Sequence, residues 1–224
     1  MSFGDKKLSE IAVSVPGSTS LLREYDLDFC CGGSDTLANA AAEKGLNLAE
    51  IETRLTELQN SKAENPEEYW VNATYPEIID HILVRYHQRH REQLQELIVL
   101  ADRVESVHGD RDDCPIGVAA ELRNVYDDLS NHMMKEEHVL FPMIKAGNYM
   151  MAQMPIRMME MEHAEHGEHL DVLKSLTNNM TPPADACNTW RALYSGIQEF
   201  ADDLMMHIHR ENNILFPRVI AENH

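Results

Sequence analysis

A segment of fifteen residues occurs twice in this chain of 224 residues, and it restricts the possible fold more than any other feature. DLSNHMMKEEHVLFP begins at Asp128 and DLMMHIHRENNILFP begins at Asp203, so both copies read Asp-x3-His-x3-Glu-x3-Leu-Phe-Pro. Residues four apart lie on one face of an α-helix. The repeat therefore predicts two equivalent helices, each of which presents a histidine and a carboxylate beside core leucines.

Four long stretches of apolar residues at helical spacing follow the middle of the chain, and none of them alternates as a strand does. The helices are expected at about residues 76–107, 115–146, 155–178 and 184–221. The short loops between them predict an up-down-up-down four-helix bundle. Pro142 and Pro217 fall late in their helices, where a proline predicts a kink or a break.

The first part of the chain has a different organisation. Residues 1–60 predict several short helices. Pro16 and Gly17 separate two of them, and another ends at Gly45. Residues 61–75 are polar and read as a linker. The sequence thus predicts an all-α protein with a small helical N-terminal domain (1–60), a linker (61–75) and a helical bundle (76–224).

The charge of the chain restricts its partners. The formal net charge of −19 opposes binding to phosphate backbones, so we expect no nucleic-acid partner. No apolar run approaches the length that spans a membrane, and the N-terminal residues lack the apolar segment of a signal peptide. We therefore expect a cytoplasmic protein. The four cysteines are too few and too unevenly spaced for a disulfide framework or a zinc ribbon.

The two copies of the repeat supply four candidate metal ligands, His132, Glu136, His207 and Glu211. Burying such groups without partners is costly, and a metal ion would remove that cost. The first and third long helices add one histidine each, either His87 or His90 and either His163 or His166, because both choices fit the helical period. Four imidazoles and two carboxylates suit a dinuclear site for iron, or for manganese or zinc.

Other polar residues lie one turn from these candidates or beside them. Asp128, Asp203 and Glu162 are interpreted either as solvated carboxylates or as residues that orient the imidazoles and relay protons. The remaining histidines are expected at the surface or behind the ligands: His81, His108, His138, His169, His209 and His224.

The motifs match a known family along nearly the whole chain. YDLDFCCGG, IIDHILVRYHQRHREQL, SNHMMKEEHVLFPMIKAG, MEMEHAEHG and LMMHIHRENNILFPR resemble the RIC (repair of iron centres) proteins of the YtfE/ScdA type, which have a hemerythrin-like domain. The resemblance selects His87 over His90 and His163 over His166. It implies an oxo-bridged di-iron centre with six ligands, the two glutamates bridging: His87, His132, Glu136, His163, His207 and Glu211. Gly167 occupies the position where oxygen-carrying hemerythrins have a further histidine, which argues against reversible oxygen transport.

The resemblance also implies a function. We expect a protein, homodimeric in solution, that repairs iron-sulfur clusters damaged by oxidative or nitrosative stress, with iron donation favoured over enzymatic turnover. Its partners would be proteins with damaged clusters, and oxygen or nitric oxide would be small ligands. One alternative is an enzyme that reduces nitric oxide at the di-iron centre, with Glu162 or Asp128 supplying protons. Another is a protein that senses oxygen or nitric oxide.

Cys30 and Cys31 are adjacent and are followed by Gly32 and Gly33. Thiols near a helix N-terminus have a lowered pKa, so this position predicts reactive thiolates. The alternative is a pair of small core residues. The resemblance favours a redox-responsive or iron-transferring thiol pair. Cys114 and Cys187 have no neighbouring cysteine and are interpreted as packing or surface residues.

Overall fold

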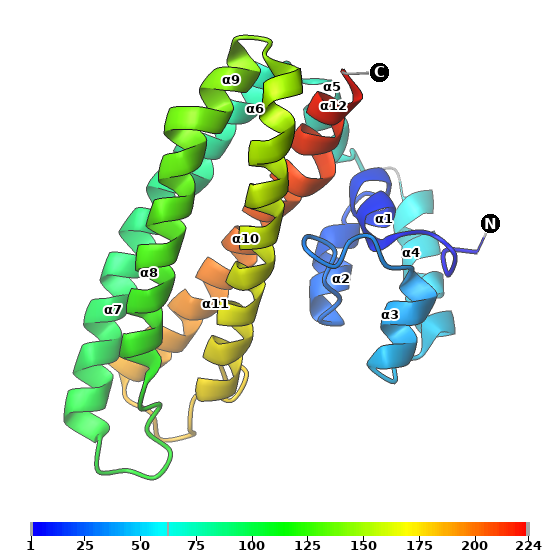
Figure 1. Cartoon of the computed structure of the whole chain (residues 1–224). Helices are drawn as coiled ribbons and strands as arrows, with labels where there is room; N and C mark the ends of the chain where they lie inside the picture. Colours follow the sequence, from blue (N-terminus) through cyan, green and yellow to red (C-terminus); the bar gives the residue numbers. More distant parts are fainter. Residues whose placement is uncertain (1, 62, 223–224) are drawn as a thin grey trace. The chain divides into compact units, whose positions relative to one another are not determined.

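A computed structural model describes residues 2–61 and 63–222. These residues form helices joined by loops, with no strand among them, which confirms the all-α class (Figure 1). His224, one of the histidines considered above, lies outside the described residues. Internal contacts divide the chain into two units. Unit 1 comprises Met1–Ile78 and Met206–His224, and unit 2 comprises Ile79–Met205. Each unit is described by itself.

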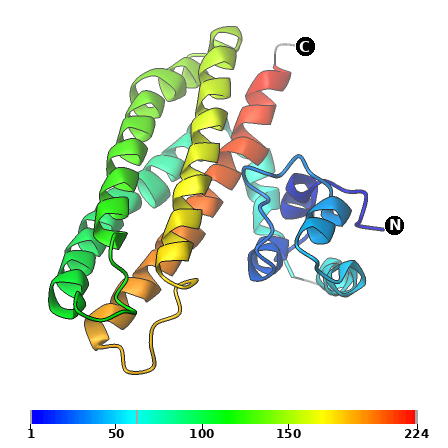
Figure 2. The same ribbon diagram turned by 60° about the horizontal axis from the view of Figure 1, so that its bottom comes forward.

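Unit 2 is a bundle of long helices, visible side by side in Figures 1 and 2. Its elements are, in order, α6 (Tyr75–Ile82, which begins in unit 1), η1 (Leu83–His87), α7 (Gln88–His108), α8 (Val118–Lys135), η2 (Glu136–Leu140), α9 (Phe141–Lys145), α10 (Tyr149–Leu176) and α11 (Asn188–Arg210, which ends in unit 1). Helix α8 packs against both α7 and α10. Apolar residues at helical spacing are buried here, among them Leu94, Leu97, Leu129, Trp190 and Phe200.

Three π-helical turns interrupt the long helices, and the first of them, η1, is not followed by a proline that would have indicated it. In each, a backbone N–H bonds to the carbonyl five residues earlier: Gln88 to Leu83, Phe141 to Glu136, and Phe216 to Glu211. The last two turns directly precede Pro142 and Pro217. A proline crowds the turn that precedes it, and a widened turn relieves this crowding. The predicted interruptions therefore occur as π-turns.

The third long helix begins earlier than expected. It was placed at residue 155, whereas α10 begins at Tyr149 and contains Pro155 within it. Gly147 adopts a left-handed φ of 74° and ends α9, and the carbonyl of Asn148 accepts hydrogen bonds from the N–H groups of Met151 and Ala152. The new helix therefore begins directly after Asn148. Pro155 lies inside α10 and not in its first turn.

Unit 1 contains the short helices of the N-terminal region and the end of the chain. They are α1 (Leu8–Ser14), α2 (Ser18–Glu24), α3 (Leu37–Glu43), α4 (Leu48–Asn60), α5 (Pro66–Asn72), η3 (Glu211–Leu215) and α12 (Phe216–Ala221). Its core includes Ile11, Leu22, Phe29, Leu37 and Ile51. Helix α5 lies within the segment expected to be a linker. Asn65 caps it, because its side chain accepts a hydrogen bond from the N–H of Glu67.

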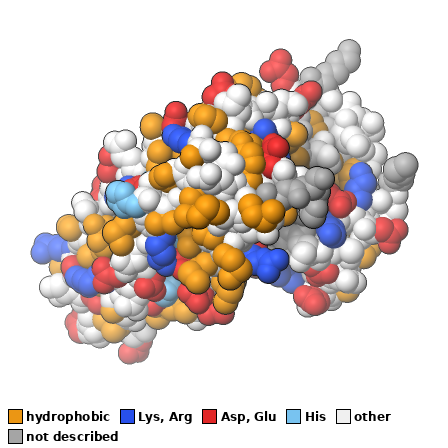
Figure 3. Space-filling view, turned by 45° about the horizontal axis from the view of Figure 1, so that its top comes forward, with side chains coloured by type: hydrophobic (Ala, Val, Ile, Leu, Met, Phe, Trp, Pro, Cys, Tyr) orange, Lys and Arg blue, Asp and Glu red, His pale blue; other side chains and the backbone are white. Residues whose placement is uncertain are grey.

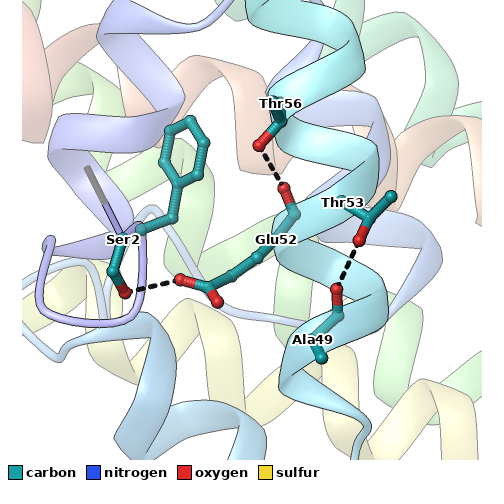
Figure 4. A pocket seen from close by; sticks show the side chains of 6 residues that line it. Ser2, Ala49, Glu52, Thr53 and Thr56 are labelled. Carbon is teal, nitrogen blue, oxygen red and sulfur yellow. Dashed lines mark hydrogen bonds between the residues drawn. The ribbon is translucent and has the colours of Figure 1, made fainter.

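The first residues of the chain are fixed to α4 around a small pocket (Figure 4). The Glu52 carboxylate accepts hydrogen bonds from the Ser2 hydroxyl, at 2.7 Å, and from the N–H of Gly4, at 2.8 Å. These bonds lower the pKa of Glu52, the Ser2 bond having the largest effect. The pocket offers no group of metal-ligating side chains, so it is a structural attachment of the N-terminus.

Exposed methionines follow the surface of α10 and include Met150, Met154, Met158 and Met161. These four methionines therefore lie outside the core. Figure 3 shows exposed hydrophobic side chains, in orange, among the charged ones. Within the described residues, no helix combines the length and the apolar character needed to cross a membrane.

Candidate metal centre

A buried group of imidazoles and a carboxylate lies inside the bundle of unit 2. Glu136 Oε2 lies 3.3 Å from His87 Nε2 and 3.4 Å from His132 Nε2. His163 Nε2 lies 3.1 Å from His132 Nε2. All four side chains are at most 1% exposed. Buried nitrogen and oxygen atoms that converge in this way suit a metal centre.

Two carboxylates fix the outer nitrogens of these histidines. His87 Nδ1 lies 2.8 Å from Glu137 Oε1, and His132 Nδ1 lies 2.9 Å from Glu162 Oε2. Arg91 pairs with Glu137 and Lys135 with Glu162. The pKa of each glutamate falls to about 2, mainly because of its histidine, and both remain ionised. Each imidazole therefore carries its proton on Nδ1 and directs Nε2 toward Glu136.

Glu137 was not identified as a functional residue from the sequence. It follows Glu136 directly, but it shares a helical face with none of the candidate ligands. The π-turn at Glu136–Leu140 explains the omission, because it changes the direction in which successive side chains project. An α-helical projection of the sequence would not have placed Glu137 at His87. An Arg four residues after His87 was the available signal, since Arg91 holds the same carboxylate.

Replacing Glu137 with glutamine should weaken metal binding by roughly 10- to 100-fold, the usual effect of removing a carboxylate behind a histidine ligand. The amide is close in size but cannot act as an ionised acceptor for both His87 and Arg91. Metal affinity should be measured by competition with a chelator. The control is Glu96→Gln, an exposed residue of α7, which should leave the affinity unchanged. Equal effects of the two substitutions would contradict the role of Glu137.

Unit 1 contains the other copy of the repeated motif. His207 Nε2 lies 3.3 Å from Glu211 Oε1, and both side chains are at most 1% exposed. Glu211 opens the π-turn η3, as Glu136 opens η2. The two copies of the repeat thus adopt the same local structure, with a histidine at the end of an α-helix and a glutamate at the first residue of a π-turn.

The alternative histidines His90 and His166 are buried but have different neighbours. The His90 ring packs against Tyr86 and, edge-on, against Phe200 at a centroid distance of 5.4 Å. The His166 ring meets His132 edge-on at 4.9 Å. Neither belongs to a group of converging ligand atoms among the described residues, whereas His87 and His163 do. Aromatic packing thus accounts for the burial of His90.

Asp128 and Asp203 do not contact the imidazoles of the repeat. Asp128 Oδ2 lies 3.1 Å from His169 Nε2, and its side chain is 59% exposed. Asp203 forms a two-armed ion pair with Arg85 and accepts a hydrogen bond from Gln93. The aspartates of the repeat therefore connect helices within the bundle. Of the three carboxylates considered, only Glu162 contacts a candidate ligand.

His169 connects α10 to two carboxylates of α8, at 2.6 Å to Glu121 and 3.1 Å to Asp128. Burial alone would lower the pKa of His169, but these two hydrogen bonds outweigh burial and raise it. The charged form therefore stabilises the fold fully below its unfolded pKa of about 6.5, and the contribution is lost as pH rises through the folded value.

We expect His169→Gln to lower the free energy of unfolding by about 1 kcal/mol near pH 6, allowing for the partial exposure of the pair. The difference from the unsubstituted protein should shrink as the pH is raised through the folded pKa of His169, because the residue then becomes neutral in both states. Thermal unfolding at pH 6 and at a series of higher pH values measures this. His138→Gln, at an exposed position, is the control. A deficit that grows with pH would contradict the assignment.

His209 was expected either at the surface or behind the ligands, and it does not lie at the surface. It is fully buried in unit 1, where its ring meets Phe29 edge-on at 5.4 Å. Glu67 Oε2 lies 3.5 Å from His209 Nε2 and also pairs with the buried Arg210. Burial opposes ionisation of Glu67, but His209 and Arg210 outweigh it and lower its pKa. Two members of this buried cluster, His209 and Arg210, directly precede Glu211 in the sequence. His138 is exposed, as expected.

Cys30 and Cys31 lie in the loop between α2 and α3, with their sulfur atoms 3.7 Å apart and not bonded. The expectation of a lowered pKa is wrong for Cys30. Hydrogen bonding with Cys31, burial and the nearby Asp28 raise its pKa well above the ordinary value. Helix α3 begins only at Leu37 and is capped by Thr36, so its N-terminus does not stabilise a thiolate here. Cys114 is buried, and Cys187 is exposed 3.3 Å from His108 Nε2.

Gly167 lies one turn after His163 on α10. Apart from its chain neighbours and the backbone of its own helix, a Cβ built at Gly167 would meet no atom within 4 Å. The glycine itself contributes no side-chain ligand.

Known proteins resemble the chain in both of its parts. The family model of the Hemerythrin HHE cation binding domain matches residues 78–219, and that of the ScdA_N domain, described as a domain of unknown function, matches residues 4–59. A probable iron-sulfur cluster repair protein of Haemophilus influenzae is 68% identical over 99% of this chain and 100% of the relative. The chain belongs to the RIC family. The iron-sulfur cluster repair proteins YtfE of Musicola paradisiaca (55% identical, 98% of both chains) and Escherichia coli (54%, 99% of both chains) are further relatives.

Membership of the RIC family agrees with the buried donor set. The cation-binding model spans every residue proposed as a ligand from the sequence, from His87 to Glu211. The buried histidines and glutamates suit a metal centre in this family.

Proposed function

We propose that this protein repairs iron-sulfur clusters damaged by oxidative or nitrosative stress and that it does so by donating iron. Its RIC relatives are named iron-sulfur cluster repair proteins and match it from end to end. The observation that carries the proposal is the convergence of His132 Nε2, His163 Nε2 and Glu136 in a buried space. Iron bound there would supply redox chemistry and would also be the cargo delivered to the damaged cluster.

We assign six residues to a di-iron centre: His87, His132, Glu136, His163, His207 and Glu211. The donor chemistry fits iron, because imidazoles and carboxylates are its usual protein ligands at sites with open positions. The buried carboxylates of Glu136 and Glu211 each lie within 3.4 Å of an imidazole nitrogen, and a cation bound there would offset the cost of burying them. The repeated local structure supports equivalent roles for the two glutamates, as bridging ligands.

The surrounding residues hold the geometry of the site, and one position on α10 adds no ligand to it. Glu137 and Glu162 hold the two imidazoles in one tautomer and orientation, so the site keeps its geometry while a metal ion enters or leaves. Gly167 provides no further ligand. A site with fewer protein ligands exchanges its metal more readily, and this suits a donor better than an oxygen carrier.

Reduction of nitric oxide by the same centre is the second candidate, since it would require the same ligands. The two proposed proton donors are poorly placed for it. Both oxygens of Glu162 are engaged, one by His132 and the other by Lys135. Asp128 is occupied by His169 on an exposed surface. These contacts favour donation over a reductase that relies on either residue as a proton relay.

One experiment distinguishes the two functions. Iron-loaded protein is reduced and exposed to nitric oxide, and iron transfer to an apo iron-sulfur protein and formation of nitrous oxide are followed in the same preparation. We expect iron to leave for the acceptor and nitrous oxide to stay near one turnover. Sustained nitrous oxide production by protein that retains its iron would overturn the donor proposal in favour of the enzyme.

A further inference from the structure

The loop that carries the cysteine pair brings three metal-ligating side chains together. Asp28, Cys30 and Cys31 each offer a ligand atom, and these atoms lie within 4.8 Å of one another. None of the three belongs to the centre assigned above. We propose that Asp28, Cys30 and Cys31 bind one divalent cation of the zinc or ferrous class, as a second metal site of this chain.

The separations of the ligand atoms fit a tetrahedral ion. A metal-sulfur bond of about 2.3 Å places two sulfur ligands about 3.8 Å apart in tetrahedral geometry. The sulfur atoms of Cys30 and Cys31 are 3.7 Å apart. A carboxylate oxygen bound at about 2.0 Å would lie roughly 3.5 Å from each sulfur, and Asp28 Oδ1 is 3.2 Å from the Cys30 sulfur. Little rearrangement is therefore required to hold the ion.

The loop is already held in the conformation that the ion needs. The Asp28 carboxylate accepts hydrogen bonds from the N–H groups of Cys30, Cys31 and Gly32, at 2.8–3.0 Å. Oδ1 accepts two of these bonds and Oδ2 accepts one, so a lone pair of Oδ2 is left for an ion once the Cys30 thiol has lost its proton. Gly33 has to be glycine, because a Cβ there would lie 2.5 Å from the Phe29 carbonyl.

Other segments of unit 1 also hold the loop in place by hydrogen bonds. Asn212 donates a hydrogen bond to the Cys30 carbonyl at 3.0 Å, and Asn213 donates one to the Phe29 carbonyl at 2.8 Å. On the other side, the N–H of Ser9 bonds to the Gly33 carbonyl. Both asparagines follow Glu211 in η3. A preformed loop loses little conformational freedom on binding, which strengthens a site of only three ligands.

The chemistry of the ligands defines the class of ion. Two thiolates and one carboxylate suit Zn²⁺ or Fe²⁺ better than Mg²⁺ or Ca²⁺, which prefer oxygen. Cys31 is half-buried and Asp28 is exposed, so the fourth position of a tetrahedral ion faces solvent. An open position allows the ion to be passed to another ligand. The site goes beyond the proposed repair function, because binding of a cation here is measurable without any damaged cluster.

The test uses Co²⁺ as the probe on full-length protein whose His/Glu centre is already loaded with iron. Cys114→Ser/Cys187→Ser removes the other thiols. We expect a thiolate-to-cobalt charge-transfer band that saturates at one equivalent and is displaced by Zn²⁺. Cys30→Ser/Cys31→Ser should abolish the band. Asp28→Asn, which keeps one carbonyl oxygen for the backbone bonds, should weaken cobalt binding roughly tenfold or more.

Asp35→Asn is the matched control, because Asp35 also caps this loop through the N–H of Thr36 but does not join the group of ligands. It should bind cobalt as the parent does. X-ray absorption at the cobalt edge of the parent adds a readout that needs no substitution at the site, and two sulfur neighbours at about 2.3 Å are expected. The absence of the band or its persistence without Cys30 and Cys31 would overturn the site, as would equal binding by the Asp28 and Asp35 variants.

Discussion

Replacing His132 with alanine is expected to lower the metal content of the purified protein roughly tenfold or more. His132 contacts Glu136, His163 and Glu162 at once, with its Nε2 3.4 Å from Glu136 and 3.1 Å from His163. Its removal takes away a ligand and leaves Glu162 without the imidazole that it positions, so the loss should exceed that of Glu137→Gln.

The measurement is elemental analysis of protein purified anaerobically from iron-supplemented cells, with circular dichroism to verify that the helices remain. His138→Ala is the matched control, since it removes an exposed imidazole less than two turns away on the same chain segment. It should retain the full metal content. Equal depletion in both variants would show that the histidines of the repeat act through general stability and are not ligands.

The second large effect is expected from Glu67→Ala, which should lower the free energy of unfolding by about 3–5 kcal/mol. Glu67 is 5% exposed and pairs with Arg210, which is 3% exposed, through both arms of its guanidinium. Without the Glu67 carboxylate, the buried guanidinium of Arg210 loses its ion pair and keeps its contact with the Trp70 ring. For a chain of this size the midpoint of thermal unfolding should fall by roughly 10 °C.

Glu68→Ala provides the comparison, because it removes the same group from the next residue of α5, where the side chain is exposed. Its effect should be small. The double variant Glu67→Leu/Arg210→Met should recover most of the stability, since replacing both members of a buried ion pair is far less harmful than removing one. If the double variant is as unstable as Glu67→Ala, loss of packing and not an unpaired charge is the cause.

The same contacts change how the chain should be shortened. A truncated protein that begins at residue 68 would keep every proposed ligand, because all of them follow the polar segment. It would lack Glu67, and it would also lack Phe29, which packs against His209. A useful truncation has to begin before Asn65, which caps α5.

The helical fold was predictable because apolar periodicity is a local property of the sequence. The repeat likewise identified His132, Glu136, His207 and Glu211, since a four-residue spacing on a helix directly sets which side chains share a face. The choice of His87 over His90 was different. Helical periodicity leaves both open, and only the neighbours distinguish them: Phe200 and Tyr86 for one, Glu136 and Glu137 for the other.

Contacts between residues distant in sequence were not predictable. Glu67 and Arg210 are 143 residues apart, and no spacing in the sequence connects them. The raised pKa of Cys30 was missed for the same reason, because it depends on burial and on how the loop folds back onto Asp28. The start of α10 was missed because proline is a common first-turn residue, and Pro155 suggested a beginning where the helix was already under way.

The three π-turns make these helices intolerant of changes in length. Each contains one residue more than an α-helical turn would need, and Glu136 and Glu211 each open one. Deleting a single residue there would restore ordinary helical pitch at no backbone cost, yet it would rotate everything beyond it by about 100° relative to the residues before it. Leu140 and Phe141 would then leave the core while His132 stayed in place. In this protein the number of residues between ligand and proline is therefore as strongly constrained as the identity of the ligands.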